Sequence, residues 1–355
     1  MIDPENTLPI ISAGGVLPIV TLAGHNDDED DPPEPGDGAP EIELRSALVP
    51  DSSHGSRLDR TLVQLVPEFS RNYLQQLMAA GGVKVNGALA SKPSLKTRAG
   101  DSVEIELRPT PESRAFIAEP MDLDIVFEDS SLLVVNKPVG MVVHPAPGNW
   151  SGTLLNGLLA RHQDAAALPR AGIVHRLDKD TSGLMVVARK RSVMDQLVKM
   201  IAAREVSREY LALAHGTWQG ARTREVNQPV GRDPRNRLRM AVVDPDRNPG
   251  KLASTVVSLL ENVDAAGGYC FLKCKLKTGR THQIRVHLSF LNHPLVGDTL
   301  YGGLGAAGLE RQALHAWRLS FAHPVTGEAL AFLSPPPTDF RTALDELGLR
   351  YNEIQ

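Results

Sequence analysis

The sequence predicts an α+β protein in which a small α/β domain precedes a larger domain built on a mixed, mainly antiparallel sheet. Two observations predict this fold. Between residues 120 and 340, short apolar strands outnumber helices and do not alternate with them regularly, which argues against a doubly wound parallel sheet. Residues 56–108 form a compact pattern of two helices and a hairpin. A length of 355 residues is enough for two such domains.

The elements of the larger domain follow from apolar runs and helix boundary signals. Strands are predicted at 125–127, 132–135, 184–188, 210–214, 255–259 and 271–276. Helices are predicted at 153–161, 193–203 and 282–292, the last of them ended by Pro294.

The small domain has clear helix and turn signals. Ser56 and Ser70 can cap its two helices, and Gly81-Gly82 can close the second one. Residues 83–85 alternate like a short strand and lead into the Asn86-Gly87 turn, which is typical of a hairpin.

The ends of the chain differ from these domains. Residues 1–50 combine prolines and glycines with an acidic run, so we expect a disordered acidic tail. We interpret residues 109–119 as a linker and residues 341–355 as a C-terminal tail.

Residues 1–44 hold eleven carboxylates and no Lys or Arg, and without them 38 basic side chains stand against 31 acidic ones. That positive balance suits a polyanionic partner.

Composition also limits the chemistry. Cys270 and Cys274 have no second pair with which to build a zinc site, so we expect reduced thiols in a cytosolic protein. No signal peptide or membrane span is predicted. Asp178 and Asp180 imitate the start of a calcium loop, but the twelfth position from Asp178 is Arg189 instead of glutamate, so calcium is rejected.

Residues 172–188, GIVHRLDKDTSGLMVVA, contain the likeliest chemical centre. Two apolar segments flank a turn that holds Asp178 between Arg176 and Lys179. A purely structural alternative is a polar loop whose carboxylates cap backbone amides.

Four stretches together resemble one family. They read NKPVGMVVHP at 136–145, HRLDKDTSGL at 175–184, REYLAL at 208–213, and GRTHQIRVH at 279–287 followed by HPLVGD at 293–298. Their content and order resemble the pseudouridine synthases that act on large-subunit ribosomal RNA, the RluA/RluD group. Residues 56–108 resemble the S-four-type RNA-binding domain, through RLD at 57–59, SR at 70–71, GVKVNG at 82–87 and GD at 100–101.

The resemblance implies an isomerase that converts uridine to pseudouridine in RNA without a cofactor or a metal. It implies that Asp178 acts as the ionised nucleophile or base, that Tyr210 stacks on an everted uracil, and that Arg285 pairs with the aspartate. A half-buried strand tyrosine is the structural alternative for Tyr210, and a surface arginine the alternative for Arg285. Arg176 could lie beside Asp178 or fill the gap left by the extruded nucleotide.

RNA contacts are expected in two places. In the small domain, the resemblance makes Arg57, Arg71 and Lys84 candidates for phosphate binding. In the larger domain, residues 222–251 are rich in arginine, and the candidates there are Arg232, Arg235, Arg237 and Arg239. A solvated surface is the alternative for both.

The predicted protein is a cytoplasmic monomer with RNA as its partner and no membrane association. The acidic tail is either a solvating extension or an arm that mimics RNA. Two other functions stay open: a non-catalytic RNA-binding or ribosome-assembly factor, and the same enzyme acting on transfer RNA.

Overall fold

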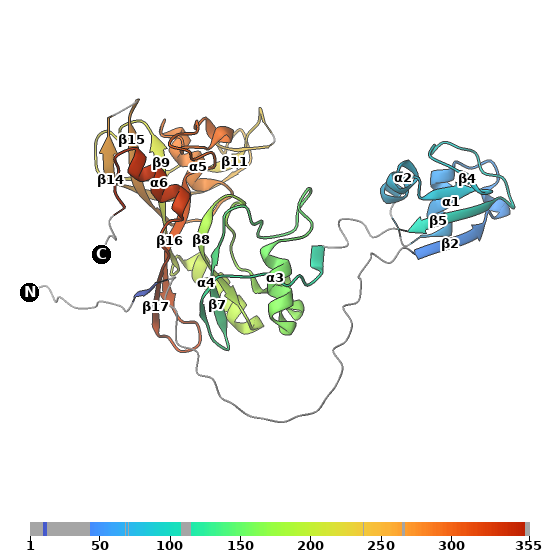
Figure 1. The fold of residues 1–355 in the computed structure, drawn as a ribbon, viewed down its shortest axis with the longest axis horizontal. Coiled ribbons are helices and arrows are strands. Elements are labelled where there is room, and N and C mark those ends of the chain that lie inside the picture. Colours follow the sequence, from blue (N-terminus) through green and yellow to red (C-terminus); the bar gives the residue numbers. More distant parts are fainter. Residues whose placement is uncertain are drawn as a thin grey trace, which may run out of the picture. The chain divides into compact units, whose positions relative to one another are not determined.

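A computed structural model describes residues 10–12, 43–67, 69, 71–107, 115–236, 238–264 and 267–351. The chain divides into two compact units, one within residues 19–115 and the other formed by residues 1–18 and 116–355 (Figure 1). We call them the small domain and the large domain.

The small domain packs two helices, α1 (Leu58–Leu65) and α2 (Arg71–Ala79), against a four-stranded antiparallel sheet of order β2-β5-β3-β4. The strands are β2 (Glu43–Leu48), β3 (Val83–Val85), β4 (Ala88–Leu89) and β5 (Ser102–Leu107). Leu58 and Leu62 of α1, Leu74 of α2 and Ile105 of β5 are fully buried in one core. The two predicted helices and the hairpin are therefore present. Helix α1 is preceded by Arg57 instead of Ser56 and has no side-chain cap, and Ser70 lies outside the described residues.

The predicted tail over residues 1–50 is wrong at its C-terminal end. Strand β2 pairs with β5 along its whole length, so residues from Glu43 onward belong to the small domain. The sequence pattern gave no sign of this strand because its side chains lie mostly in solvent, with Leu44 66% and Leu48 67% exposed. Backbone hydrogen bonds to the edge of β5 hold it. Residues 10–12 form β1 (Ile10–Ser12), which pairs with a strand of the large domain, and the rest of residues 1–42 lies outside the described part.

The large domain is organised around a ten-stranded mixed sheet, with the order β10-β14-β15-β9-β16-β8-β7-β6 and with β17 and β1 joined beyond β16. Its strands are β6 (Ile125–Glu128), β7 (Leu132–Lys137), β8 (Ser182–Ala188), β9 (Ser207–His215), β10 (Thr223–Asn227), β14 (Ser254–Val263), β15 (Tyr269–Leu276), β16 (Leu314–Ala322) and β17 (Ala329–Leu333). Among the described strands of this sheet, β16 with β8 and β1 with β17 are parallel and the other pairs are antiparallel. The predicted fold class is confirmed.

Helices cover both faces of this sheet. Helices α3 (Leu154–Arg161) and α5 (Gln283–Phe290) pack on the face that carries Tyr210 and Ala212 of β9. The alternate residues Leu211 and Leu213 face α6 (Thr338–Glu346), and α4 (Arg191–Ala203) covers the same side of β7 and β8. A separate three-stranded sheet consists of β11 (Val230–Arg232), β12 (Met240–Val242) and β13 (Gly250–Lys251).

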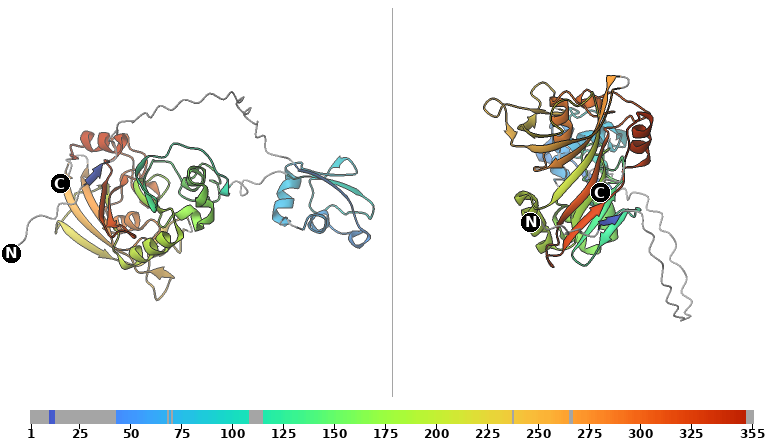
Figure 2. Two further views of the ribbon diagram at one scale, coloured as in Figure 1. Left: turned by 90° about the horizontal axis from the view of Figure 1, so that it is seen from below. Right: turned by 90° about the vertical axis from the view of Figure 1, so that its left-hand side faces the viewer.

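The predicted C-terminal tail is also wrong over most of its length. Helix α6 buries Phe340, Ala343 and Leu344 against Trp317 and Phe271, and it lies on the sheet as the red helix in Figure 2. The i, i+3, i+4 spacing of its apolar residues is a helix signal that the sequence analysis overlooked. Residue 108, residues 109–114 of the predicted linker and residues 352–355 lie outside the described part. No described helix is long and apolar enough to cross a bilayer.

Candidate active site

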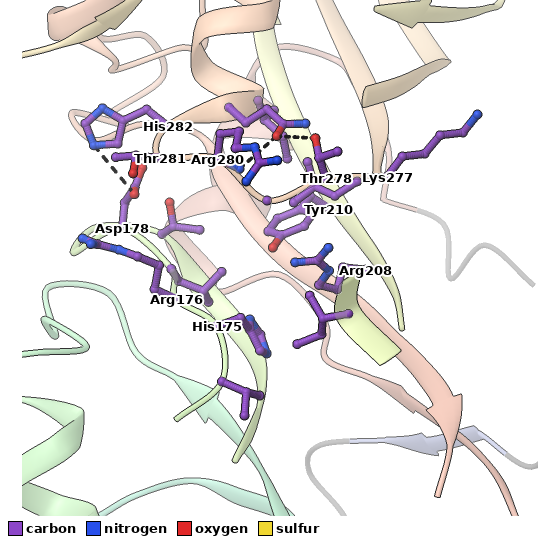
Figure 3. Close-up of a pocket in the computed structure, with 18 of the residues that line it drawn as sticks. His175, Arg176, Asp178, Arg208, Tyr210, Lys277, Thr278, Arg280, Thr281 and His282 are labelled. Carbon is purple, nitrogen blue, oxygen red and sulfur yellow. Dashed lines mark hydrogen bonds and ion pairs between the residues drawn. The ribbon is translucent and has the colours of Figure 1, made fainter. Parts of the chain in front are cut away.

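A cavity of about 740 Å³ opens on the α5 side of the large domain (Figure 3). The loop before β8, the start of β9, residues 276–281 and the first turn of α5 line it. Asp178, Tyr210 and Arg285, which are far apart in the sequence, all contribute to its wall.

Asp178 lies in the loop between the bridge at Ile173 and strand β8, in a turn closed by the bond from Thr181 N to Asp178 O (3.1 Å). Just beyond, Gly183 has φ +112°, and a Cβ there would come within 2.2 Å of Ala316 O. Only glycine therefore permits the close parallel pairing of β8 with β16 that fixes the C-terminal end of the loop.

Lys137 holds the other side of the same loop. Its side chain is fully buried, and its Nζ donates to the carbonyls of Pro138 (2.8 Å), Met141 (3.0 Å) and Lys179 (2.9 Å). Burial lowers the pKa of Lys137 to about 7, against the pull of Asp180 and Asp178. Three carbonyl acceptors match the three donors of an ammonium group, so Lys137 ties the loop that carries Asp178 to the end of β7.

Arg285 connects two carboxylates. Its Nη1 donates to Asp178 Oδ2 (2.9 Å), while Nε and Nη2 donate to the two oxygens of Asp298 at 2.8 Å each. Burial would lower the pKa of Arg285, but the hydrogen bonds and charges of Asp298 and Asp178 raise it, so the guanidinium stays charged. Asp298 orients the Arg285 guanidinium through Nε and Nη2, and Nη1 remains to donate to Asp178.

His282 and Tyr301 complete the surroundings of Asp178, and the sequence analysis gave neither of them a role. His282 has φ +55° ahead of α5, and its Nδ1 lies 2.8 Å from Tyr301 Oη and its Nε2 3.8 Å from Asp178 Oδ1. Burial lowers the pKa of His282, so its ring is neutral near pH 7. The Tyr301 ring lies under the Arg285 guanidinium, 4.9 Å from Cζ to the ring centroid. The sequence signal that could have indicated a role for Tyr301 is the Gly297-Asp298 motif, because Asp298 stands three residues before it.

Tyr210 is almost fully buried on β9 and contributes to the same cavity, as Figure 3 shows. Burial raises the pKa of its phenol, so the hydroxyl is neutral at pH 7. Arg176 is exposed and also lines the cavity. The structure thus brings Asp178, Arg285, Tyr210 and Arg176 to one cavity.

The predicted RNA contacts of the small domain have partners inside that domain. Arg57 and Arg71 both donate to the buried carboxylate of Asp59, with closest distances of 3.0 and 2.6 Å, and both stay partly exposed. Lys84 Nζ lies 3.8 Å from Glu104. All three side chains are partly exposed to solvent, so each remains accessible to an RNA phosphate.

The basic run of the large domain lies on and beside the small three-stranded sheet. Arg232 and Arg235 are exposed, and Arg239 pairs with Asp233 at 2.6 Å. Arg237 lies outside the described residues.

No group of three His, Cys, Asp or Glu side chains comes together as metal ligands in the part of the chain that the structure describes. Cys270 and Cys274 are buried free thiols, and burial raises the pKa of Cys270 to about 12. Neither thiol is a nucleophile at neutral pH.

The family model described as RNA pseudouridylate synthase matches residues 131–290, and the S4 domain model matches residues 56–103. The chain belongs to the RNA pseudouridylate synthase family and carries an S4 domain, which binds RNA.

Named relatives extend over most of the chain. The ribosomal large subunit pseudouridine synthase D of Neisseria meningitidis is 47% identical over 329 residues, covering 88% of this chain and 84% of the relative. The protein of the same name from Xanthomonas campestris is 43% identical over 317 residues, covering 86% and 92%. Among solved structures, human RNA Pseudouridylate Synthase Domain Containing 4 is 25% identical with a TM-score of 0.50, covering 64% of this chain and 94% of that one.

Proposed function

We propose that this enzyme isomerises uridine to pseudouridine in large-subunit ribosomal RNA, with Asp178 as its catalytic carboxylate and without a cofactor. The observation that carries the proposal is the state of that carboxylate. Oδ2 accepts a hydrogen bond from Arg285, whereas Oδ1 accepts none from the described residues and has His282 Nε2 at 3.8 Å; the Asp178 side chain belongs to the cavity wall. One oxygen is thus anchored and the other is available to a substrate.

The reaction needs such an oxygen. The N1–C1′ glycosidic bond breaks, the uracil turns, a C5–C1′ bond forms, C5 loses its proton and N1 gains one, so that the composition of the nucleotide does not change. Asp178 can attack the sugar, attack the base or remove a sugar proton, and each of these routes starts from the ionised carboxylate. Arg285 stabilises that form and orients it.

Tyr210 and the cavity wall handle the base. A stacked uridine cannot reach Asp178 and must be turned out of the RNA, at a cost of a few kcal/mol. Stacking on the ring of Tyr210 offsets about 1–3 kcal/mol of this cost. Arg176, at the exposed side of the cavity, is suited to fill the space that the base leaves.

The choice of ribosomal RNA rests on the relatives, which are named as ribosomal large subunit pseudouridine synthases. The S4 domain, with Arg57, Arg71 and Lys84, and the basic segment with Arg232, Arg235, Arg237 and Arg239 would bind the RNA backbone. We further propose that the protein works as a monomer in the cytoplasm.

The test is tritium release from large-subunit ribosomal RNA transcribed with [5-³H]uridine, because pseudouridine formation removes the hydrogen on C5. The wild type should release tritium, and Asp178→Asn should reduce the rate about 10⁴-fold or more while it still binds the RNA. Asp180→Asn, which removes an equal charge two residues away, should stay active.

Three outcomes separate the alternatives. An active Asp178→Asn variant would refute the catalytic assignment. A wild type that binds this RNA without releasing tritium is a non-catalytic RNA-binding factor. Release only from labelled transfer RNA would move the target to that class.

A further inference from the structure

The cavity contains a second buried arginine, Arg208, that the proposed chemistry does not use. It lies on β9, two residues before Tyr210, and only 6% of it is exposed. Its Nε is buried without a hydrogen-bond partner, and no carboxylate pairs with its guanidinium among the described residues. In Figure 3 the guanidinium lies close to the Tyr210 ring, at the wall of the cavity.

A comparison with Arg285 shows how unusual this is. Both arginines are buried in the wall of one cavity, but Arg285 has two carboxylates and Arg208 has none within the described chain. The cavity's exposed arginines, Arg170, Arg176, Arg204 and Arg280, can be hydrated by solvent. Arg208 is largely removed from water, and an unpaired buried charge is destabilising unless a ligand supplies the missing acceptor.

The surroundings favour an anionic ligand. Seven cationic side chains line the cavity against one carboxylate, and that carboxylate, Asp178, is already bound to Arg285. A guanidinium presents a planar fork of donors that matches a phosphate.

The position on β9 indicates which phosphate. Arg208 and Tyr210 stand on the same face of the strand, about 7 Å apart along it. A nucleotide whose base stacks on Tyr210 therefore brings its own backbone next to Arg208.

The backbone of Gly279 shapes this position from the opposite side. A Cβ on Gly279 would lie 2.9 Å from Arg208 Nη1, so the guanidinium can occupy its position only because residue 279 has no side chain. A methyl group there would push the guanidinium aside, because the end of a flexible side chain yields more easily than a backbone.

We propose that Arg208 is the phosphate-binding residue of the active site and binds the backbone phosphate next to the everted uridine. This inference rests on the proposed function, since it takes the ligand of the cavity to be RNA. Arg208 would contribute mainly to substrate binding, and the cavity would hold one nucleotide at three points: the base on Tyr210, the sugar at Asp178 and the phosphate on Arg208.

The experiment uses the full chain and a synthetic RNA stem-loop around a uridine that the wild type modifies in the ribosomal transcript. Arg208→Gln should raise KM about 10–100-fold, the effect of losing a charge-assisted hydrogen bond, with a smaller change in kcat. The slope of log binding constant against log salt should fall by about 0.7–0.9, the value for one phosphate contact. In Arg208→Lys, KM should lie between the values of Arg208→Gln and the wild type, and the salt slope should equal that of the wild type. The matched control Arg341→Gln, on α6, should behave as the wild type.

Neutral linkages identify the phosphate. A methylphosphonate placed in turn on each side of the target uridine should weaken wild-type binding about 10–100-fold at one of the two positions. At that position the methylphosphonate should not weaken RNA binding by Arg208→Gln any further. It should weaken RNA binding by Gly279→Ala less than it weakens binding by the wild type. Additive losses in Arg208→Gln, or an unchanged salt slope with kcat reduced as strongly as KM is raised, would show that Arg208 contacts the base or the sugar, and would overturn the proposal.

Stability separates a ligand-binding role from a structural one. Without RNA, Arg208→Met should keep or raise Tm, because an unpaired buried charge is removed. A clear fall in Tm with an unchanged salt slope would make Arg208 structural. If the wild type converts no uridine at all, the proposed function fails, while filter binding of the same RNAs still tests the phosphate contact.

Discussion

Asp59 of the small domain and Asp178 of the large domain both accept hydrogen bonds from arginine, and they differ in how many of their carboxylate oxygens are occupied. In the small domain, Asp59 has no exposed side-chain surface and accepts from Arg57, Arg71 and Gln75 at 2.6–3.2 Å. In the large domain, the Asp178 side chain is 16% exposed, and from the described residues its carboxylate accepts one hydrogen bond, donated by Arg285.

The difference separates a structural carboxylate from the one that we propose to be catalytic. Both oxygens of Asp59 are occupied, so its charge serves to join α1 to α2. Arg285 gives two of its three bonds to Asp298, and Asp178 Oδ1 accepts no hydrogen bond from the described residues. A charged partner is common to both sites, and only an unoccupied oxygen facing a cavity marks the one that can react.

The largest expected effect concerns Arg285. A lysine can keep the charge but cannot bridge two carboxylates, so Arg285→Lys should lower kcat about 10²–10³-fold, the cost of losing one aligned donor in an active site. Single-turnover tritium release measures it, with Arg341→Lys as the control. If kcat stays within about threefold of the wild type, then the sharing of Arg285 between Asp178 and Asp298 is unimportant for catalysis.

Acid should distinguish the two domains. Burial lowers the pKa of His315 to about 4 and that of His175 to about 3, so between these values and about 6.5 the unfolded chain binds more protons than the folded one. The stability of the large domain should therefore fall as pH drops from 6.5 to 4, by roughly 3 kcal/mol for His315 alone. His315→Gln should have a smaller slope of stability against pH in this window.

The small domain should tolerate the same acid. The hydrogen bond from Arg57, with those from Arg71 and Gln75, holds the pKa of Asp59 far below its ordinary value despite burial. Its contribution is present above the unfolded pKa, near 3.9, and is lost only below that pH. All three tryptophans lie in the large domain, so their fluorescence follows that domain alone. NMR peak dispersion follows the other, and loss of both signals together at pH 5 would contradict the prediction.

The smallest expected effect is that of Asp59→Asn. It should destabilise the small domain by about 2 kcal/mol, because the charge-assisted bonds to two partly exposed arginines become weaker. Amide hydrogen exchange in α1 and α2 measures this change, and tryptophan fluorescence of the large domain should not respond. Asp101→Asn, at a partly exposed position just after the turn at residues 99–100, is the control and should cost less. Equal losses would mean that burial of Asp59 adds nothing.

The sequence by itself determined the class of fold, the division into two domains and the family to which the chain belongs. Alternating apolar runs predicted six strands of the large sheet, and each overlaps a strand of the structure, because burial of one or both faces leaves a readable pattern. The motifs around Asp178, Tyr210 and Arg285 carried the family resemblance, which the relatives confirm. Strand β2 and helix α6 were missed, the first because backbone bonds hold it, the second because its short apolar pattern was overlooked.

Only the tertiary structure decided which side chains contact each other and which carboxylate oxygens accept hydrogen bonds. Arg285 and Asp178 are 107 residues apart in the chain. No local spacing says that Asp298 takes two of the three Arg285 bonds, that His282 lies beside the Asp178 carboxylate, or that Tyr301 contacts His282 and Arg285. Arg208 shows the same limit. Its sequence neighbours identify a strand, but its burial without a carboxylate depends on β9, Gly279 and the cavity together, because the solvation of a charge is a property of its surroundings in space.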